Sequence, residues 1–233
     1  ADGVYEARAA RQLLHERLLE LEWGEWSAPA PQGRRPKAVV LAGPPGAGKS
    51  TITREVLGET HGYLEIDADR FKGHLLTQAL SDGSLEGWVK PIAVKELETQ
   101  GERFAPLEFS ALVHEESSLL AQELRDLAIE AKRDLIVDTV LGGDTPAKAL
   151  AMGEQFAQAG YDVRVIDVEV PYEVSRARIE ARWVEGRAEF FAGRDALGGR
   201  WVPSEYARSV YFGEDGVSKP ERNAEVLANE CGA

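Results

Sequence analysis

Four short apolar segments recur along the chain, each bounded by charged or turn-forming residues and separated by stretches with helical periodicity. Strands that alternate with helices form parallel sheets with helices on both faces, because each crossover returns the chain to the same edge of the sheet. The pattern therefore predicts an α/β fold with one parallel sheet, built from strands at Lys37–Ala42, Tyr63–Asp67, Asp134–Val140 and Asp162–Val170.

An amphipathic helix is predicted before the first strand, because three leucines recur at helical spacing: Leu14, Leu18 and Leu21. Gly24 marks the end of this helix. The stretch 27–36 contains three prolines and Gly33, which is typical of a linker. We therefore expect residues 1–36 to form an amino-terminal helix and linker, and residues 37–233 to form a single domain.

A helical insertion is predicted between the second and third strands. The interval from Arg70 to Arg133 is too long for one helix and contains glycine, proline and charged stretches. Its last part, Glu115–Lys132, is expected to pack on the sheet through one helical face formed by Leu120, Leu124, Leu127 and Ala131.

A glycine-rich segment directly follows the first predicted strand and precedes a helical run at 51–57. It fits the eight-residue P-loop pattern, whose backbone N–H groups surround phosphates while the next helix points its positive end at them. Lys49 is expected to reach the β- and γ-phosphates and Ser50 to bind Mg²⁺. A glycine-rich turn without a ligand is the alternative, but the flanking strand and helix disfavour it. The predicted ATP-binding residues are Gly43, Pro44, Pro45, Gly46, Ala47, Gly48, Lys49, Ser50 and Thr51.

Other P-loop classes lack their sequence signals here. The guanine-binding tetrapeptide Asn-Lys-x-Asp of GTPases and the Leu-Ser-Gly-Gly-Gln signature of transporter ATPases are both missing. Asp138 ends the third predicted strand, beside the P-loop, where it could bind Mg²⁺ together with Ser50. A strand-terminal Asp is also a common turn or helix cap, so this signal alone is weak.

Two more carboxylates, Asp67 and Asp69, lie at the end of the second predicted strand. In open α/β sheets this is the edge where ligands bind. A kinase that acts on a hydroxyl uses such a group to orient the acceptor and to take its proton, and Asp69 is the candidate base. The alternative is a cap for the helix that starts near Arg70.

Arginines are concentrated late in the chain. The stretch 174–208 contains seven arginines, no lysine and five acids, a net charge of +2. Arg178 and Arg182 are four residues apart and share a helix face. Arginines that reach the γ-phosphate would offset the negative charge of phosphoryl transfer. A solvated helix with Glu–Arg pairs is the alternative for most of the seven.

Composition narrows the possible partners. The 233 residues include 27 Lys and Arg against 40 Asp and Glu, so the net charge of −13 disfavours binding to a nucleic-acid backbone. The longest uncharged apolar run, Ala38–Ala42, is far short of the ~20 residues that span a membrane. The single cysteine, Cys231, excludes an intramolecular disulfide, which is typical of a reducing compartment. We expect a cytoplasmic protein without a nucleic-acid or membrane partner.

The combination of these segments resembles the zeta toxin family, the kinase half of the epsilon/zeta toxin–antitoxin systems. The resemblance extends from Lys37 to Arg208. It rests on the P-loop with its following threonine, Ile66-Asp67-Ala68-Asp69-Arg70-Phe71-Lys72, His114-Glu115-Glu116-Ser117-Ser118, Asp138-Thr139, Arg182 and Gly199-Arg200-Trp201-Val202-Pro203.

The resemblance implies a reaction and its residues. Residues 37–233 would form a zeta-type P-loop kinase domain that uses ATP and Mg²⁺ to phosphorylate a hydroxyl of UDP-N-acetylglucosamine, which blocks cell-wall synthesis. A small helical antitoxin is the implied partner. The implied catalytic residues are Asp69 as base, Lys49 on phosphate, and Arg182 and Arg200 on ATP; the implied substrate side includes Asp67, Glu116, Asp138 and Thr139.

Two positions depart from the family pattern. Thr139 follows Asp138 directly, whereas family members typically continue the third strand as an acid, a glycine and a threonine. Glu116 is the implied sugar-contacting acid, yet a Glu in the first turn of a helix equally suits interaction with the helix dipole.

A last helix is predicted from Ser218-Lys219-Pro220-Glu221 through Asn229, before Gly232. The family pattern would add another strand, so we expect that strand to be removed or to lie beyond residue 233. The sheet would then contain four strands and an exposed edge.

Three other functions remain open at this point. A phosphotransferase for an antibiotic or metabolite, of chloramphenicol-phosphotransferase type, would share the P-loop and the strand-end Asp. A nucleotide-dependent switch would need no acceptor-orienting base. A nucleic-acid 5′-hydroxyl kinase is the least favoured because of the negative charge.

Overall fold

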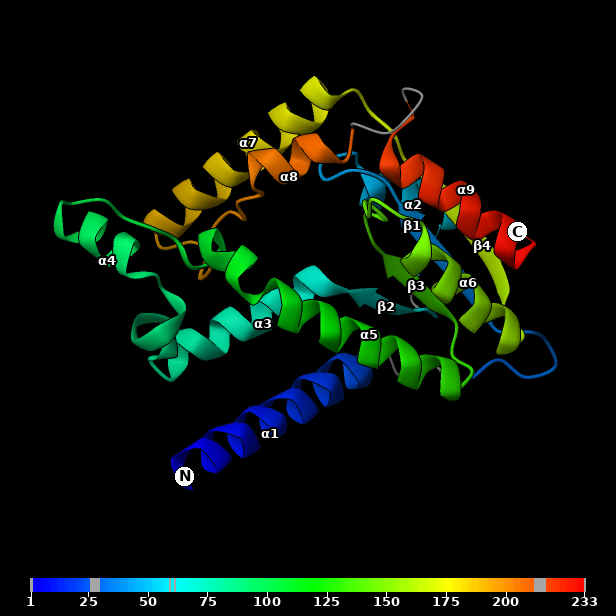
Figure 1. Ribbon diagram of the computed structural model, residues 1–233, viewed down its shortest axis with the longest axis horizontal. Coiled ribbons are helices and arrows are strands. Elements are labelled where there is room, and N and C mark those ends of the chain that lie inside the picture. Colours follow the sequence, from blue (N-terminus) through cyan, green and yellow to red (C-terminus); the bar gives the residue numbers. More distant parts are fainter. Residues whose placement is uncertain (1, 26–29, 59, 61, 212–216, 233) are drawn as a thin grey trace.

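The computed structural model describes residues 2–25, 30–58, 60, 62–211 and 217–232. Their centre is a parallel sheet with the strand order β2-β3-β1-β4 (Figure 1). The predicted α/β class and the predicted four strands are confirmed for this part of the chain. The strands are β1 (Lys37–Ala42), β2 (Leu64–Asp67), β3 (Leu135–Asp138) and β4 (Asp162–Asp167).

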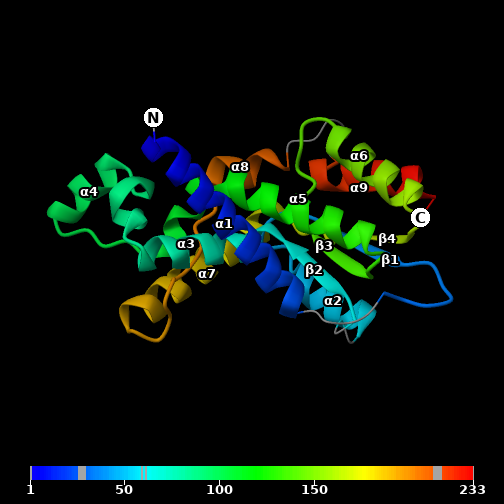
Figure 2. The same cartoon turned by 90° about the horizontal axis from the view of Figure 1, so that it is seen from below.

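Helices cover both faces of the sheet. Figure 2 shows α2 on one side of the strands and α6 and α9 on the other. The helices are α1 (Asp2–Glu25), α2 (Lys49–Leu57), α3 (Ala68–Ser81), the π-helical turn η1 (Leu85–Val89), α4 (Ile92–Thr99), the 3₁₀ helix η2 (Pro106–Val113), α5 (His114–Glu130), α6 (Ala147–Gln158), α7 (Tyr172–Phe191), α8 (Ser204–Ser209) and α9 (Lys219–Cys231).

The two faces of β1 belong to different cores, because side chains alternate along a strand. Ala38, Val40 and Ala42 face the larger core, which also takes in side chains from α3, α5, α6 and α9. Val39 and Leu41 face a smaller core that includes side chains from β3 and the end of α2. Both faces of β1 are thus buried, as expected for the inner strand of a parallel sheet.

Two strands end earlier than predicted. We expected β3 to reach Val140 and β4 to reach Val170, but they end at Asp138 and Asp167. Their common neighbour β1 stops at Ala42, where the chain turns away at Gly43 with φ 129°. One further backbone bond forms on each side, from Thr139 N and Val168 N, and then no partner remains for the ladder.

The predicted helical insertion between β2 and β3 is confirmed, and it runs from α3 through α5. The predicted inner face of α5 is partly wrong. Leu120 and Leu124 are fully buried, but Leu127 is 41% exposed and Ala131 is exposed. The buried stripe continues through Ala128, four residues after Leu124, so Leu127 is rotated off the face.

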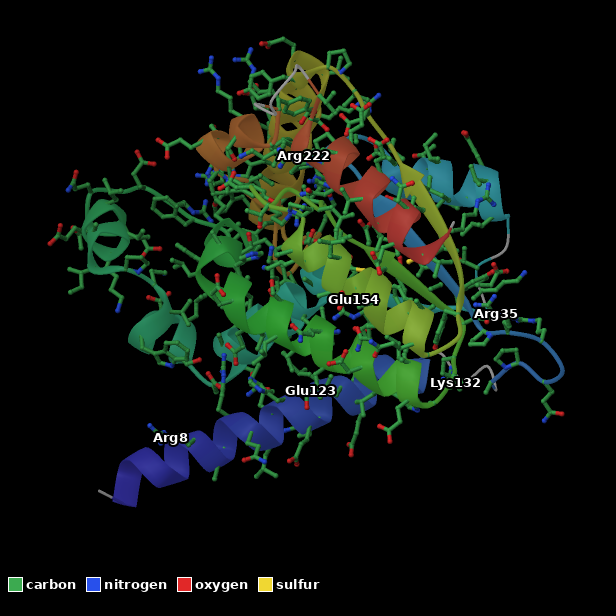
Figure 3. The ribbon with its side chains drawn as sticks, turned by 45° about the vertical axis from the view of Figure 1, so that its right-hand side comes forward. Arg8, Arg35, Glu123, Lys132, Glu154 and Arg222 are labelled. Atoms are coloured by element: carbon green, nitrogen blue, oxygen red, sulfur yellow. The ribbon has the colours of Figure 1, made fainter. Side chains whose placement is uncertain are left out.

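The amino-terminal helix α1 lies across α3 and α5 (Figure 2). Leu18 is buried and Leu14 packs against the larger core, as predicted, but Leu21 is 44% exposed. Figure 3 shows the course of α1, marked by Arg8, beneath α5, marked by Glu123. Residues 27–29 of the predicted linker lie outside the described residues.

Two charged clusters attach α1 to the insertion, and the carboxylate lies on α1 in one of them and on the insertion in the other. In the first, Glu22 of α1 is 1% exposed and contacts Arg70 and His74 of α3, with 2.5 Å between its Oε1 and His74 Nε2. In the second, Glu116 of α5 accepts two 2.5 Å hydrogen bonds from Arg11 and lies 2.5 Å from His15 Nε2. Each cluster pairs one carboxylate with an arginine and a histidine four residues apart on the facing helix.

The predicted last helix is confirmed as α9. The Ser218 hydroxyl caps its first turn by accepting a hydrogen bond from Glu221 N at 3.1 Å, and Gly232 ends it with φ 64°. Figure 3 places Arg222 on α9 and Glu154 on the adjacent α6. In the described ranges, no helix has the length and apolar character needed to cross a membrane.

Glu22→Gln should destabilise the fold. Burial by itself raises the pKa of Glu22, but the hydrogen bonds and charges of His74 and Arg70 outweigh it, so the pKa lies below the usual 4.5. A depressed carboxyl pKa stabilises the fold above the unfolded value, and this contribution is lost as the pH falls. We expect a loss of about 2 kcal/mol in unfolding free energy near neutral pH, measured by urea denaturation.

The matched control is Glu20→Gln, because Glu20 is exposed on the same helix. It should change the unfolding free energy by less than about 0.5 kcal/mol. Equal stability of the Glu22→Gln variant and the wild type would show that the buried carboxylate does not hold α1 in place.

Candidate active site

The carboxyl ends of three neighbouring strands bring the predicted site residues to one edge of the sheet. The P-loop follows β1, Asp67 ends β2 and Asp138 ends β3. The register pairs Asp138 with Leu41 on one side and with Asp67 on the other. These three strand ends therefore lie side by side, as expected for a ligand-binding edge of an open α/β sheet.

The P-loop needs its glycines at two points of close approach. A Cβ on Gly43 would lie 2.3 Å from the carbonyl oxygen of Val168, and a Cβ on Gly46 would lie 2.9 Å from that of Ser175. Both residues also have positive φ, which L side chains rarely adopt. The loop then leads into α2 at Lys49, so the amino-terminal end of α2 faces any phosphate bound in the loop.

Lys49 lies between the loop and the third strand. Its Nζ donates to the Gly43 carbonyl at 3.2 Å and is 3.5 Å from Asp138 Oδ1. Burial raises the pKa of Asp138, and the ammonium group of Lys49 opposes that rise only in part. This ammonium group can thus be shared between Asp138 and a phosphate.

Asp67 caps α3 and is held in an unfavourable electrostatic environment. Its Oδ1 accepts a hydrogen bond from Asp69 N at 2.8 Å, which satisfies the first turn of the helix. Burial, followed by the negative charge of Asp138, raises the pKa of Asp67 to about 7. At neutral pH, Asp67 is therefore balanced between its protonated and ionised forms.

Asp69 follows Asp67 by two residues, in the first turn of α3. Its side chain is 39% exposed and projects from the first turn of α3. Lys72 Nζ lies 2.9 Å from its Oδ1, and Arg200 contacts its Oδ2. Burial lowers the pKa of Arg200, while Asp67 and Tyr206 oppose this effect.

Tight backbone packing positions Arg200. A Cβ on Gly199 would lie 2.3 Å from the carbonyl oxygen of Trp183, and one on Gly186 would lie 2.5 Å from Gly199 Cα. The segment before α8 therefore packs directly on the backbone of α7. Trp183 and Trp201 pack edge to face across the same contact, with ring centroids 4.9 Å apart.

The other predicted residues lie in separate surroundings. Glu116 contacts α1 through Arg11 and His15. Arg182 is exposed on α7, and Ser50 and Thr51 are exposed at the start of α2. Thr139 Oγ1 accepts a hydrogen bond from Leu141 N at 3.4 Å. Among the residues that the structure describes, contacts connect Lys49 to Asp138 and Asp69 to Arg200, with Asp67 between these pairs, and they do not extend to Glu116 or Arg182.

Two α7 side chains that support the P-loop were not assigned that role from the sequence. Arg178 Nη1 donates to the carbonyl oxygens of Gly46 and Ala47 at 3.2 and 3.0 Å. Ser175 Oγ donates to Pro45 O at 2.7 Å. The sequence signal was the position of Arg178 on the face of Arg182, but helical spacing cannot indicate which carbonyl a side chain reaches.

The donor set fits Mg²⁺ and a nucleotide phosphate. The Ser50 hydroxyl and the Asp138 carboxylate are the hard oxygen ligands that Mg²⁺ prefers. In the part of the chain that the structure describes, no three His, Cys, Asp or Glu side chains gather to hold a metal ion. At nucleotide sites Mg²⁺ typically takes one or two protein ligands and completes its coordination with phosphate and water.

The fold and site define a P-loop protein of the kinase-like α/β class. The chain matches the family model described as Zeta toxin over residues 22–75 and 97–223, well over half of its length. The protein therefore belongs to the Zeta toxin family, a family of kinase-type phosphotransferases. No curated protein matches its sequence.

The AvrRxo1 structures show the same fold. A chain of the AvrRxo1-ORF1:AvrRxo1-ORF2 complex with sulphate ions superposes with a TM-score of 0.54 at 24% identity, covering 76% of this chain and 51% of that chain. A chain of the same complex crystallised with ATP superposes with a TM-score of 0.54 at 23% identity, and the match covers the same shares of the two chains. The protein thus spans about half the length of the AvrRxo1 chain it matches. A chain of the PezAT toxin–antitoxin system of Streptococcus pneumoniae has a TM-score of 0.49 at 15% sequence identity. That match covers 93% of this chain and 94% of the PezAT chain.

Asp67→Asn should stabilise the protein at neutral and alkaline pH. Asn can keep the cap on α3 but removes a carboxylate whose ionisation is opposed by burial. The folded pKa is about 7 against a usual 3.8, so the folded protein binds an extra proton between these values. Wild-type stability is therefore lost as the pH rises through this range.

We expect the stabilising effect of Asp67→Asn to grow by about 2 kcal/mol between about pH 5 and about pH 8. Urea denaturation of both proteins at the two pH values measures the difference. A stabilisation that does not change with pH would show that Asp67 is ionised in the folded protein throughout this range.

Proposed function

We propose that this protein is an ATP-dependent small-molecule kinase of zeta-toxin type, which phosphorylates a hydroxyl of UDP-N-acetylglucosamine and so blocks cell-wall synthesis. The observation that supports this most is the position of Asp69 directly after β2, at the same edge of the sheet as the P-loop, where its side chain is 39% exposed and flanked by Lys72 and Arg200. A binding module or switch would not require such a carboxylate. Membership of the Zeta toxin family points to the same chemistry.

In the proposed reaction, Asp69 takes the proton of the acceptor hydroxyl while that oxygen forms a bond to the γ-phosphorus of ATP. The bond between the γ-phosphorus and the bridging oxygen breaks, and ADP leaves. Lys49 and the P-loop N–H groups stabilise the charge on the β- and γ-phosphate oxygens. Arg200 and Arg182 would move onto the phosphates, the first from its contact with Asp69 and the second from the exposed face of α7.

The proposed cofactors are ATP, which Gly43–Thr51 would hold, and Mg²⁺, which Ser50 and Asp138 would hold. When bound, Mg²⁺ neutralises part of the phosphate charge. Asp138 already shares Lys49 with the loop, so its carboxylate is oriented toward the phosphate site. Lys49 would bind the phosphates. Ser175 and Arg178 of α7 hold the backbone of the P-loop in place through hydrogen bonds to its carbonyl oxygens.

The acceptor would bind on the side of the site formed by Asp67, Glu116, Asp138 and Thr139. Glu116 is engaged by α1, so contact with a sugar would require a rearrangement of Arg11 and His15. A second candidate acceptor is another small alcohol, such as an antibiotic or metabolite. The pairing of Glu116 with Arg11 and His15 favours this candidate, because the acid that the sugar would contact is already held by α1.

The proposed cellular setting is the cytoplasm, where UDP-N-acetylglucosamine and ATP are available. A small helical antitoxin is the proposed partner. Support comes from the family assignment and from the AvrRxo1 structures, in which the matched chain was crystallised as an ORF1:ORF2 complex.

Asp69→Asn should strongly decrease the rate of phosphoryl transfer but leave ATP binding nearly unchanged. Asn keeps the shape of the side chain and cannot accept the proton, so we expect kcat to fall about 100-fold or more with ATP affinity changed less than about threefold. A coupled assay with UDP-N-acetylglucosamine measures transfer, and titration with ATP measures binding.

The matched control is Asp126→Asn, because Asp126 is a half-exposed aspartate on α5 that contacts Gln155. It should retain wild-type kinetics. Wild-type transfer by the Asp69→Asn variant would overturn the assignment of the base. Labelling of an unrelated alcohol by radioactive ATP, with none of UDP-N-acetylglucosamine, would establish the second candidate acceptor instead.

A further inference from the structure

The two carboxylate oxygens of Asp69 have different partners. Lys72 Nζ is 2.9 Å from Oδ1, and the guanidinium group of Arg200 contacts Oδ2. Both oxygens are therefore occupied by cations. A general base must present one oxygen to the hydroxyl whose proton it takes, so at least one of these cations has to leave during turnover.

Lys72 belongs to the same helix as the base. It follows Asp69 by three residues on α3, a spacing at which helical side chains face each other. Its side chain is only 11% exposed, whereas that of Asp69 is 39% exposed. Lys72 is thus enclosed on the protein side of the carboxylate, and the accessible side is left to the acceptor.

Lys72 lies in a largely buried setting among other titratable side chains. Burial lowers the pKa of Lys72, and the negative charge of Asp67 partly restores it. On the other side, burial lowers the pKa of His114 at the start of α5, and the charge of Lys72 adds to that effect. Lys72 therefore faces two acids and one histidine: Asp67, Asp69 and His114.

Arg200 reaches Asp69 from outside the helix. It lies in the segment between α7 and α8, and its side chain is 20% exposed. An arginine on a separate segment can leave the carboxylate without any change in α3. By contrast, Lys72 and Asp69 belong to one helical turn, so their contact does not depend on the position of a second segment.

We propose that Lys72 is the positioning residue of the base: it holds Oδ1 of Asp69 in every state of the site, while Oδ2 exchanges Arg200 for the acceptor hydroxyl. This inference rests on the proposed kinase function. The proton of the acceptor moves to Oδ2 as its oxygen bonds to phosphorus. Arg200, once released, is free to contact the phosphates.

The arrangement has two consequences for catalysis. A carboxylate held at one oxygen cannot rotate freely, so its second oxygen keeps a defined direction toward the acceptor. A cation in direct contact also favours the ionised form of Asp69, which is the form that accepts a proton. Loss of the Lys72 charge should therefore affect both the rate and its pH dependence.

The test compares Lys72→Met and Lys72→Gln with Lys72→Arg in the full-length protein. For the two neutral variants we expect kcat to fall about tenfold or more and the acidic limb of its pH profile to move up by about one pH unit. The KM for ATP should change less than about threefold, because the contact of Lys72 in the structure is with Asp69 on its own helix. Lys72→Arg restores the charge, so its acidic limb should return close to that of the wild type.

Lys90→Met is the matched control. Lys90 is another buried lysine, 7% exposed in its side chain, and it pairs with Glu86 and Glu98 in the part of the insertion formed by η1 and α4. The Lys90→Met variant should have a lower midpoint of thermal unfolding, but the acidic limb of its kcat pH profile should stay at the wild-type position. This comparison separates the general cost of removing a buried lysine from an effect on the base.

A second measurement does not require turnover. In protein labelled with ¹³C at the aspartate carboxyls, the Asp69 resonance, assigned with the Asp69→Asn variant, reports its own titration. The neutral Lys72 variants should titrate about one pH unit higher than the wild type.

An unchanged titration and an unchanged acidic limb would overturn the proposal, even if activity falls, because Lys72 would then support only the fold. If the wild type transfers phosphate to no acceptor, the kinase function fails. The carboxyl titration still decides whether Lys72 holds Asp69.

Discussion

The parallel pairing of β1 with β3 on one side and β4 on the other is the constraint on which the site depends. It fixes Leu41 opposite Asp138 and Ala42 opposite Asp167, so the P-loop starts where both neighbouring ladders end. The close approach of Gly43 to Val168 leaves no room for a side chain at that point. This register brings the P-loop beside Asp138, and the pairing of β2 with β3 places Asp67 on the other side of Asp138.

Much of this arrangement could be predicted from the sequence. The order of strands and helices, the P-loop, the strand-end acids and the capped last helix all follow from local patterns of apolar, glycine and capping residues. The early ends of β3 and β4 could not be predicted, because they depend on where β1 leaves the sheet. The same holds for Leu127, whose exposure is set by the rotation of α5 against its neighbours.

Side-chain partners within the site were the least predictable feature. The motif that contains Asp69 also contains Lys72, and helical spacing alone brings them together. The contact of Arg200 with Asp69 and that of Arg178 with the P-loop each join segments more than 100 residues apart. Such contacts depend on tertiary packing, here the glycine-mediated contact between α7 and the segment before α8. The burial of Asp67 beside Asp138 likewise trades stability for a concentration of acids at the functional edge.

The two clusters that attach α1 also give this helix a direction. In its first half α1 presents Arg11 to an acid of α5, and near its end it presents Glu22 to an arginine of α3. A helix docked the opposite way round would place Glu22 against Glu116 and Arg11 against Arg70, so like charges would meet at both positions. Charge order, in addition to apolar contact, therefore selects one polarity for α1 and sets the side from which the chain approaches β1.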